Sequence, residues 1–478
     1  MLEPKVVQLT AGSAVLGLVL AAGVVTLAGP WDSGQRTAER ARAAAQGPTG
    51  GAHHGATGPG RAAPRPPAPA PSAPGVLTAL AAPRPQAAPG TGPAAPPPAP
   101  LAPTLGPLLA DPGLGPLRTA SVVDLTTGKP LYGSGAGVPM TPASTIKIAT
   151  TAAALAALGP DHRIPTTAVA TPDARRVTLV GGGDPTLDPA RLRALAADTA
   201  RALRTRRVTT VTLTYDTSRY AGPERHPIGV NDNIAPVTAL MTDEGRLGGP
   251  AGGPAPRSAD PAGDTARAFA ALLAEHGVTA GKPPARARAP QRATTLAKTW
   301  SEPLSALVER TLTHSDNDLA EALARQTAIA TGHPASFAGA ERAVREQLRE
   351  LGVPLAGTRF ADGSGLDRAD RATAALLTAL LARAADPARP ELRPVLTGLP
   401  VGGFSGTLED RFGDGSPGAA GAGLVRAKTG TLSGVNALAG TVVTRDGRLL
   451  AFAFLAGRTP SPYAAQPALD RLATALLR

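Results

Sequence analysis

The chain has 478 residues and is 42% hydrophobic, so it is long enough for one large or two ordinary domains with a sizeable core. It has no cysteine, which excludes a disulfide framework, thiol catalysis and a cysteine metal site. The formal net charge is +12, but aromatic residues make up only 3% and are not interleaved with the basic ones. We therefore expect scattered surface charge and no nucleic-acid binding.

The first 30 residues predict a membrane segment. Val6 to Gly29 contains no charged residue and is long enough to cross a bilayer. Thr26 and Ala28 form a weak cleavage signal, so we interpret residues 1–30 as a signal anchor, with a cleaved signal peptide as the alternative. Either way, the remainder of the chain is expected on the extracytoplasmic side of the cell membrane, or secreted if the signal is cleaved.

Residues 31–107 predict a linker. This stretch is rich in proline, alanine and glycine, and such a composition cannot bury enough apolar surface to fold. We expect a disordered tether between the membrane and a folded part that begins near Leu108.

A helix is predicted from Pro142 to Leu158. Thr141 is suited to cap its first N–H groups, and proline is favourable at the first helical position. Lys147 is its only charged residue, so the helix is expected to be buried.

Ser144 and Lys147 are three residues apart and share one face of this helix. Burial disfavours the charged form of a lysine, and a neutral amine in contact with a hydroxyl can accept its proton. The pair therefore suggests an activated serine nucleophile at a helix N-terminus. Because Ser-x-x-Lys is common by chance, this interpretation needs support from the rest of the chain.

The other predicted elements follow a clear order. Strands are expected at Thr119–Leu125, from Leu131, and at Val177–Val180, Val208–Tyr215, Leu424–Ala427, Val435–Thr444 and Leu449–Leu455. Helices are expected at Pro189–Leu203, Asp260–His276, Pro303–Leu312, Asp318–Ala330, Ala372–Ala384 and Tyr463–Leu477. This order predicts an α+β fold, with an antiparallel sheet built from both ends of the folded region and a helical lobe beside it. We expect one domain from residues 108–160 and 291–478, and an inserted domain at 161–290.

Two further motifs carry possible chemistry. Ser315 and Asn317 lie on a predicted loop between two helices, although Ser, Asp and Asn are also ordinary helix-capping residues. Lys428-Thr429-Gly430-Thr431 follows a predicted strand and is alternatively an ordinary strand end.

Each motif is weak alone, but the ordered set Ser-x-x-Lys, Ser-x-Asn and Lys-Thr-Gly in these structural contexts is specific. The chain resembles the penicillin-binding protein and serine β-lactamase superfamily, and within it the class C low-molecular-mass penicillin-binding proteins, the D-alanyl-D-alanine carboxypeptidase/endopeptidases. Further stretches similar to that group are Gly183–Leu187, Tyr215-Asp216, Ala221–Pro223, Ala235–Leu240, Asp362–Leu366 and Gly406–Leu408. The resemblance covers about 108–478, but the stretch between Leu240 and Asp260 is short where relatives typically carry a further small domain.

The resemblance implies a role for each motif residue. Ser144 would be the nucleophile and Lys147 its proton acceptor. Ser315 would relay a proton to the leaving amine, and Asn317 would hold Lys147 or the substrate amide. Lys428 would supply positive charge that keeps Lys147 neutral. The hydroxyls of Thr429 and Thr431 would bind the terminal carboxylate of the substrate, and Gly430 would permit close approach of the strand and the substrate. The N–H groups of Ser144 and Thr431 would form an oxyanion hole.

The implied activity is hydrolysis of D-alanyl-D-alanine bonds in peptidoglycan stem peptides through an acyl-enzyme, with β-lactam antibiotics acylating the same serine. A serine β-lactamase shares all three motifs and stays open, as does a non-catalytic wall-binding or sensor protein. No cofactor is expected. No metal is expected either, because the seven histidines show no His-Glu-x-x-His spacing, and His162, His226 and His276 fit surface or satisfied core positions.

Overall fold

The computed structural model describes residues 100–229, 231–248 and 252–478. The predicted membrane segment and almost all of the predicted linker lie outside the described residues. In the part that is described, no helix combines the length and the apolar character needed to cross a membrane.

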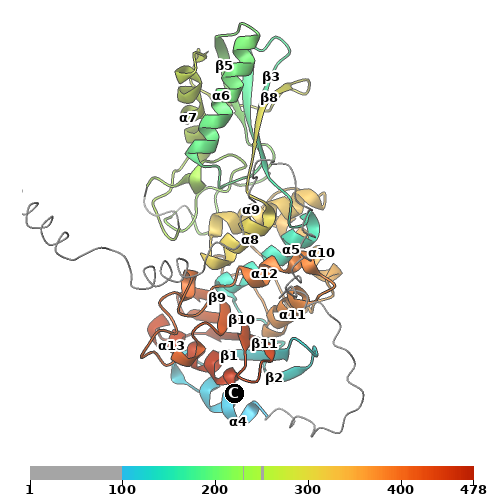
Figure 1. Ribbon diagram of the computed structural model, residues 1–478, viewed down its shortest axis with the longest axis vertical. Helices are drawn as coiled ribbons and strands as arrows, with labels where there is room; N and C mark the ends of the chain where they lie inside the picture. Colours follow the sequence, from blue (N-terminus) through green and yellow to red (C-terminus); the bar gives the residue numbers. More distant parts are fainter. Residues whose placement is uncertain (1–99, 230, 249–251) are drawn as a thin grey trace, which may run out of the picture. The chain divides into compact units, whose positions relative to one another are not determined.

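A five-stranded antiparallel sheet combines the two ends of the folded region, as the sequence predicted (Figure 1). Its order is β2-β1-β11-β10-β9. The strands are β1 (Leu117–Asp124), β2 (Pro130–Ser134), β9 (Val425–Leu432), β10 (Val435–Val443) and β11 (Leu449–Gly457). Every neighbouring pair runs antiparallel.

Both faces of this sheet are buried because its central strands are apolar on each side. Phe452 and Phe454 of β11 share a core with α13 (Pro462–Thr474) and α4 (Ala102–Leu109). The alternate residues Ala451 and Ala453 face a second core with the helical lobe. The strand period of two therefore divides one sequence between two hydrophobic layers.

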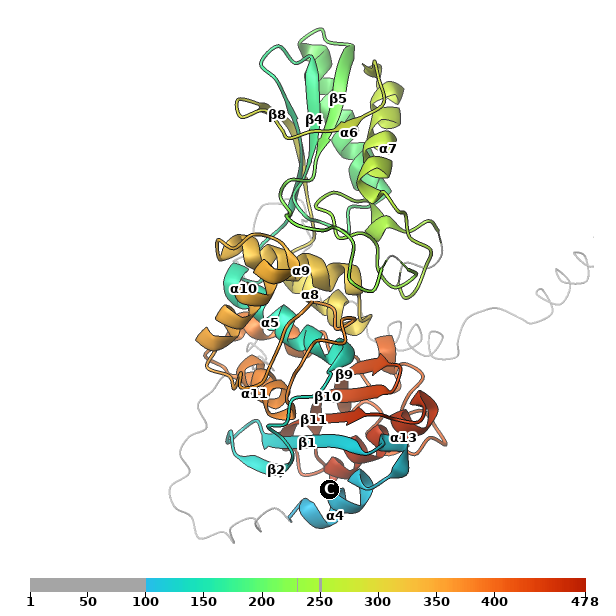
Figure 2. The same ribbon diagram turned by 180° about the vertical axis from the view of Figure 1, so that it is seen from behind.

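The helical lobe lies between the two sheets (Figures 1 and 2). Its members are α5 (Lys147–Leu158), α8 (Leu304–Thr313), α9 (Asn317–Ala330), α10 (Phe337–Glu350), α11 (Ala374–Ala385) and the short α12 (Pro394–Thr397). Short 3₁₀ turns occur at η1 (Pro112–Leu114), η2 (Ala143–Ile146), η3 (Asp243–Gly245), η4 (Pro390–Leu392), η5 (Gly406–Leu408), η6 (Ala419–Gly421) and η7 (Ala475–Leu477). The helix α10 was not predicted from the sequence.

A second sheet forms the insertion, with the order β6-β5-β4-β3-β8 and β7 pairing with β5. Its strands are β3 (Pro165–Ala170), β4 (Arg176–Gly181), β5 (Thr210–Asp216), β6 (Thr279–Ala280), β7 (Ala285–Arg286) and β8 (Thr294–Trp300). Helices α6 (Pro189–Thr205) and α7 (Pro261–Glu275) share its hydrophobic core. We refer to residues 165–300 as the insertion lobe. The predicted boundary after residue 290 falls too early, because β8 pairs with β3 along its length.

Two predictions at helix starts are corrected. The folded part begins earlier than Leu108, because α4 buries Leu105 and Leu109 against the C-terminal half of the fold. Thr141 does not cap the serine helix. That helix opens with η2, whose first turn has no side-chain cap, and the Thr141 hydroxyl instead accepts a hydrogen bond from Arg371.

Candidate active site

Ser144 and Lys147 lie together at the start of the buried helix, as predicted. Ser144 is in η2, and Lys147 is the first residue of α5. The Lys147 amine is completely buried and lies 3.1 Å from the Ser144 hydroxyl oxygen. It also donates to the Asn317 side-chain oxygen at 2.7 Å and to the Ser364 carbonyl at 2.6 Å. These two acceptors fix the amine beside the serine.

The surroundings of Lys147 lower the pKa of its amine, so that the proton is lost more easily than from an exposed lysine. Burial lowers the pKa of Lys147 to about 8, while the nearby carboxylates of Asp362, Asp316 and Glu321 oppose that shift. An amine with this pKa is present in the neutral form to a useful extent near neutral pH. The geometry and the electrostatics therefore both suit proton transfer from Ser144.

The Ser315–Asn317 segment connects α8 to α9. Asp316 caps α9 by accepting from the Leu319 N–H at 3.0 Å, while its neighbours Ser315 and Asn317 line the same cavity as Ser144. Ser315 has a φ of 57°, a strained conformation for a non-glycine residue. The Asn317 amide donates to the Asn233 carbonyl at 3.0 Å, which turns its oxygen toward Lys147.

The Lys428–Thr431 motif lies on β9, at the edge of the sheet next to η2. Gly430 permits this approach, since a Cβ atom there would lie 2.7 Å from the Pro142 carbonyl oxygen. The Thr429 hydroxyl bonds to the Thr407 hydroxyl at 2.9 Å, and the Lys428 amine donates to the Thr429 carbonyl at 2.9 Å. Thr407 belongs to η5, a segment for which no role was predicted from the sequence.

Lys428 is also completely buried, and its pKa is lowered well below the usual value, first by burial and then by the charge of Lys147. The resemblance implied that Lys428 keeps its charge and holds Lys147 neutral. In the free site burial lowers the pKa of both amines, and the carboxylates beside Lys147 oppose the shift of its pKa.

Two cavities open onto the Ser144 side chain and join the three motifs. The first, of about 280 Å³, is lined by Ser144, Ser315, Asn317 and Thr431, and its outer wall contains Arg246, Arg257 and Arg310. The second, of about 290 Å³, reaches from Ser144 and Ser315 past Thr429 to Arg411 and Gln466. Five of the eight predicted site residues line at least one of these cavities, and the other three are the buried Lys147 and Lys428 and Gly430.

The arginines of the first cavity are held by buried carboxylates. Glu244 pairs with Arg310 and, at 3.1 Å, with Arg246, and Asp318 pairs with Arg257 at 3.0 Å. Arg310 also contacts Asp316 at 3.3 Å, so this network of buried polar groups braces the Ser315–Asn317 loop.

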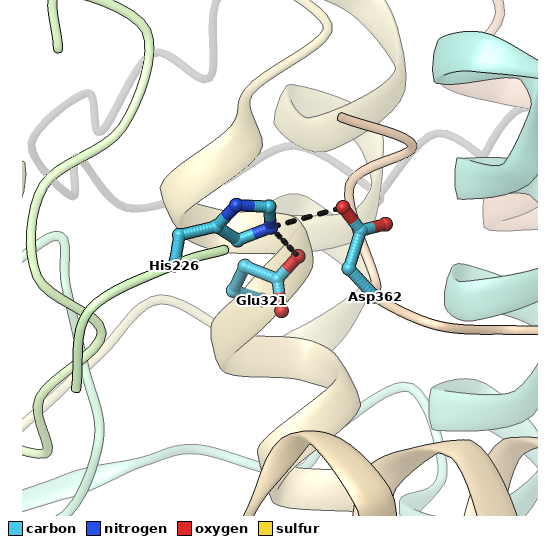
Figure 3. A group of neighbouring side chains, drawn as sticks. All are labelled: His226, Glu321 and Asp362. Atoms are coloured by element: carbon cyan, nitrogen blue, oxygen red, sulfur yellow. Dashed lines mark hydrogen bonds and ion pairs between the residues drawn. The ribbon is translucent and has the colours of Figure 1, made fainter. Parts of the chain in front are cut away.

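A second group of side chains lies behind Lys147, where His226, Glu321 and Asp362 converge (Figure 3). The facing oxygens are already engaged as acceptors. Asp362 Oδ2 accepts from the Ser364 hydroxyl and the Asp367 N–H, and Glu321 Oε1 accepts from the N–H groups of Gly363 and Ser364. We therefore assign this cluster to hydrogen bonding that supports the loop of residues 361–367, not to metal binding.

The fold defines a class of protein, namely the α+β proteins with a penicillin-binding or β-lactamase-like fold. The arrangement is similar to the crystal structure of penicillin-binding protein 4 from Haemophilus influenzae, with a TM-score of 0.66 and 21% identity over 77% of this chain and 98% of that one. At this identity the likeness concerns the fold.

The sequence comparisons identify the family. Residues 101–249 and 253–476 match the D-Ala-D-Ala carboxypeptidase 3 (S13) family, and the chain belongs to it. It is 40% identical over 391 residues to carboxypeptidase DacB of Mycolicibacterium smegmatis, covering 79% of this chain and 83% of that protein. It is 30% identical over 447 residues to the D-alanyl-D-alanine carboxypeptidase of Actinomadura sp., covering 76% and 82%.

Proposed function

We propose that this protein is a serine D-alanyl-D-alanine carboxypeptidase/endopeptidase that acts on peptidoglycan stem peptides through an acyl-enzyme on Ser144. The observation that carries the proposal is the buried Lys147 amine, 3.1 Å from the Ser144 hydroxyl and held by Asn317 and Ser364. Membership of the S13 family supplies the substrate class.

Acylation begins when the neutral Lys147 amine accepts the Ser144 proton and the serine oxygen attacks the carbonyl carbon between the two D-alanines. The oxyanion that forms is stabilised by the N–H groups of Ser144 and Thr431, each worth about 3 kcal/mol. The carbon–nitrogen bond then breaks, and the Lys147 ammonium returns its proton to the leaving amine through the Ser315 hydroxyl. D-Alanine leaves, and Ser144 holds the shortened peptide as an ester.

The substrate's terminal carboxylate would lie beside β9, against the hydroxyls of Thr429 and Thr431. An anion in that position favours protonation of Lys428, whose pKa is low in the free site because of burial and the charge of Lys147. Substrate binding would thus charge Lys428. A cationic Lys428 in turn lowers the pKa of Lys147, so that the amine is free when the substrate is in place.

Hydrolysis of the ester completes the reaction, with water in the place of the leaving amine. A β-lactamase would need an efficient base for this step. Asp316 is a carboxylate that lines the first cavity, and it is already committed to the Leu319 N–H and, at 3.3 Å, to Arg310. This favours slow loss of a bound β-lactam, so that such drugs act as inhibitors.

We also propose that the enzyme works at the outer face of the cell membrane, anchored by residues 1–30 and extended on the linker that follows. The uncharged stretch Val6–Gly29 and the peptidoglycan substrate support this location.

The test is to incubate the full chain with a peptide that ends in D-Ala-D-Ala, and separately with nitrocefin, alongside Ser144→Ala. We expect D-alanine release and stoichiometric, not catalytic, nitrocefin opening, both lost in the variant. Rapid nitrocefin turnover without D-alanine release would identify a β-lactamase instead. Neither reaction from folded protein would indicate a non-catalytic wall-binding protein.

A further inference from the structure

We propose that His226, from the insertion lobe, is a positioning residue for Lys147, which it influences through Asp362 and the loop of residues 361–367. The inference rests on the function proposed above. It gives the insertion lobe a part in catalysis that the three sequence motifs do not reveal.

His226 is placed to hold Asp362. Its side chain has no exposed surface, and its Nε2 atom lies 3.0 Å from Asp362 Oδ2 and 3.8 Å from Glu321 Oε1 (Figure 3). The Ile228 N–H donates to Nδ1 at 3.3 Å, which assigns the hydrogen of the neutral ring to Nε2. Nε2 carries a hydrogen in both the neutral and the charged ring, so the bond to Asp362 persists over the pH range of activity.

Asp362 in turn shapes the loop that holds the catalytic amine. Its Oδ1 atom accepts from the Gly365 N–H at 2.6 Å, and its Oδ2 atom accepts from the Ser364 hydroxyl at 3.0 Å. The Ser364 carbonyl accepts directly from Lys147 at 2.6 Å. Three hydrogen bonds therefore connect the imidazole of the insertion lobe to the amine beside Ser144.

His226 also affects Lys147 electrostatically, through the carboxylate of Asp362. Asp362 is the carboxylate that most strongly favours the ammonium form of Lys147. The N–H of His226 partly neutralises that carboxylate. If this donor is lost, Asp362 acts on Lys147 with its full charge, and the amine holds its proton more tightly. The expected result is less free amine at low pH.

The other groups around His226 are consistent with this role. Glu321 faces it from α9, and Asp362 and Asp367 face it from the loop. From α10 the Phe337 ring packs nearly perpendicular to the imidazole, with 5.4 Å between the ring centroids, and the Arg325 guanidinium of α9 stacks on Phe337. Burial lowers the pKa of His226, but the bond to Asp362 and the charges of Glu321 and Asp362 outweigh it, so the net shift is upward.

The test compares His226→Gln, which keeps a donor near the position of Nε2, with His226→Met, which removes it. The rate of Ser144 acylation by a fluorescent penicillin is measured on the full chain between about pH 6 and pH 9.5. We expect His226→Met to be about three- to tenfold slower than wild type at the acid end and to converge with it at the alkaline end. His226→Gln should stay close to wild type throughout.

Tyr220→Phe is the matched control. It removes a part-buried hydrogen bond within the insertion lobe, from the Tyr220 hydroxyl to the Gly183 carbonyl at 3.2 Å, without touching the loop of residues 361–367. Its rate ratio to wild type should not vary with pH. Should His226→Met not fold, His226→Leu replaces it.

Three results would overturn the proposal: no effect of either His226 variant, equal impairment of both, or a loss in His226→Met that is constant with pH. The last two would mean that the imidazole only fills space. Wild-type acylation is recorded in the same series, so absence of labelling there would instead count against Ser144 as the nucleophile.

Discussion

Lys147 and Lys428 are two lysines of one site, both completely buried, yet their surroundings differ. Lys147 lies at the start of α5 with the Asn317 oxygen and the Ser364 carbonyl as acceptors, and with carboxylates behind them. Lys428 lies on β9 and donates to the Thr429 carbonyl, and the positive charge of Lys147 lowers its pKa further after burial.

The difference shows that burial alone does not assign a role to a lysine. Burial lowers the pKa of both amines, and the neighbouring charges then separate them. Lys147 keeps a proton that it can exchange near neutral pH, which suits a general base. An anion beside Lys428 would favour its charged form, which suits recognition of a substrate carboxylate.

The largest expected effect distinguishes the two lysines directly. Lys147→Met should slow acylation by penicillin about 10³-fold or more, because Lys147 is the base in contact with the Ser144 hydroxyl, whereas Lys428→Met should cost about 10- to 100-fold, mainly in substrate affinity. Stopped-flow acylation rates over a range of drug concentrations separate affinity from chemistry. Lys298→Met on β8 serves as a control. Equal losses in both catalytic-site variants would remove the distinction.

Gly430→Ala should be the next most damaging change. A Cβ atom at this position would lie 2.7 Å from the Pro142 carbonyl oxygen, so β9 must move away from η2 and from Ser144. We expect acylation to fall by about 10²-fold, as for the loss of one oxyanion donor. Gly413→Ala is the control, because nothing lies within 4 Å of the added atom there. Wild-type acylation kinetics in Gly430→Ala would show that the approach of β9 is not needed.

The pH dependence tests the assignment of Lys147 as the base. Acylation should rise about tenfold per pH unit and level off above about pH 8, where the free amine predominates. Stability should change in the same direction. The folded-state pKa of about 8 lies below the ordinary lysine pKa of 10.5, so the unfolded chain binds more protons between these two pH values, and Lys147 favours folding increasingly as pH rises through that window. A flat acylation profile across pH 6 to 9 would exclude Lys147 as the titrating base.

The smallest expected effect concerns the support of β9. Thr407→Val removes the hydroxyl that bonds to Thr429 at 2.9 Å while preserving side-chain shape. We expect the KM for a D-Ala-D-Ala peptide to rise about three- to tenfold with little change in kcat, because the lost bond is worth about 1 kcal/mol. Thr205→Val on α6 controls for the substitution itself. A change in kcat alone would place Thr407 in the chemistry instead.

The sequence alone predicted the sheet built from both ends of the chain and the gathering of the three motifs at one site. These succeeded because Ser144 and Lys147 carry their geometry in a local spacing, and because β10 and β11 alternate or continue apolar residues in recognisable runs. The boundaries were less secure, as with β8, whose membership of the second sheet depends on pairing with a strand more than a hundred residues earlier.

The partners of the catalytic groups could not be predicted. Lys147 is held by the Ser364 carbonyl, and Asn317 by the Asn233 carbonyl, and main-chain contacts leave no mark in residue type. His226 and Asp362 are distant in sequence and meet only because the insertion lobe packs on α9 and the loop of residues 361–367. The pKa shifts of the two lysines depend on such neighbours as well, because the charges nearest to Lys147 come from Asp362, Asp316 and Glu321.

The most direct test of the account is to treat the full chain with penicillin at about pH 8 and locate the adduct by mass spectrometry, in wild type, Ser144→Ala and Lys147→Met. The account predicts one bound penicillin per chain on the peptide that contains Ser144, no adduct in Ser144→Ala, and very slow formation in Lys147→Met with the protein still folded. An adduct on any other residue, or rapid labelling of Ser144 without Lys147, would contradict it.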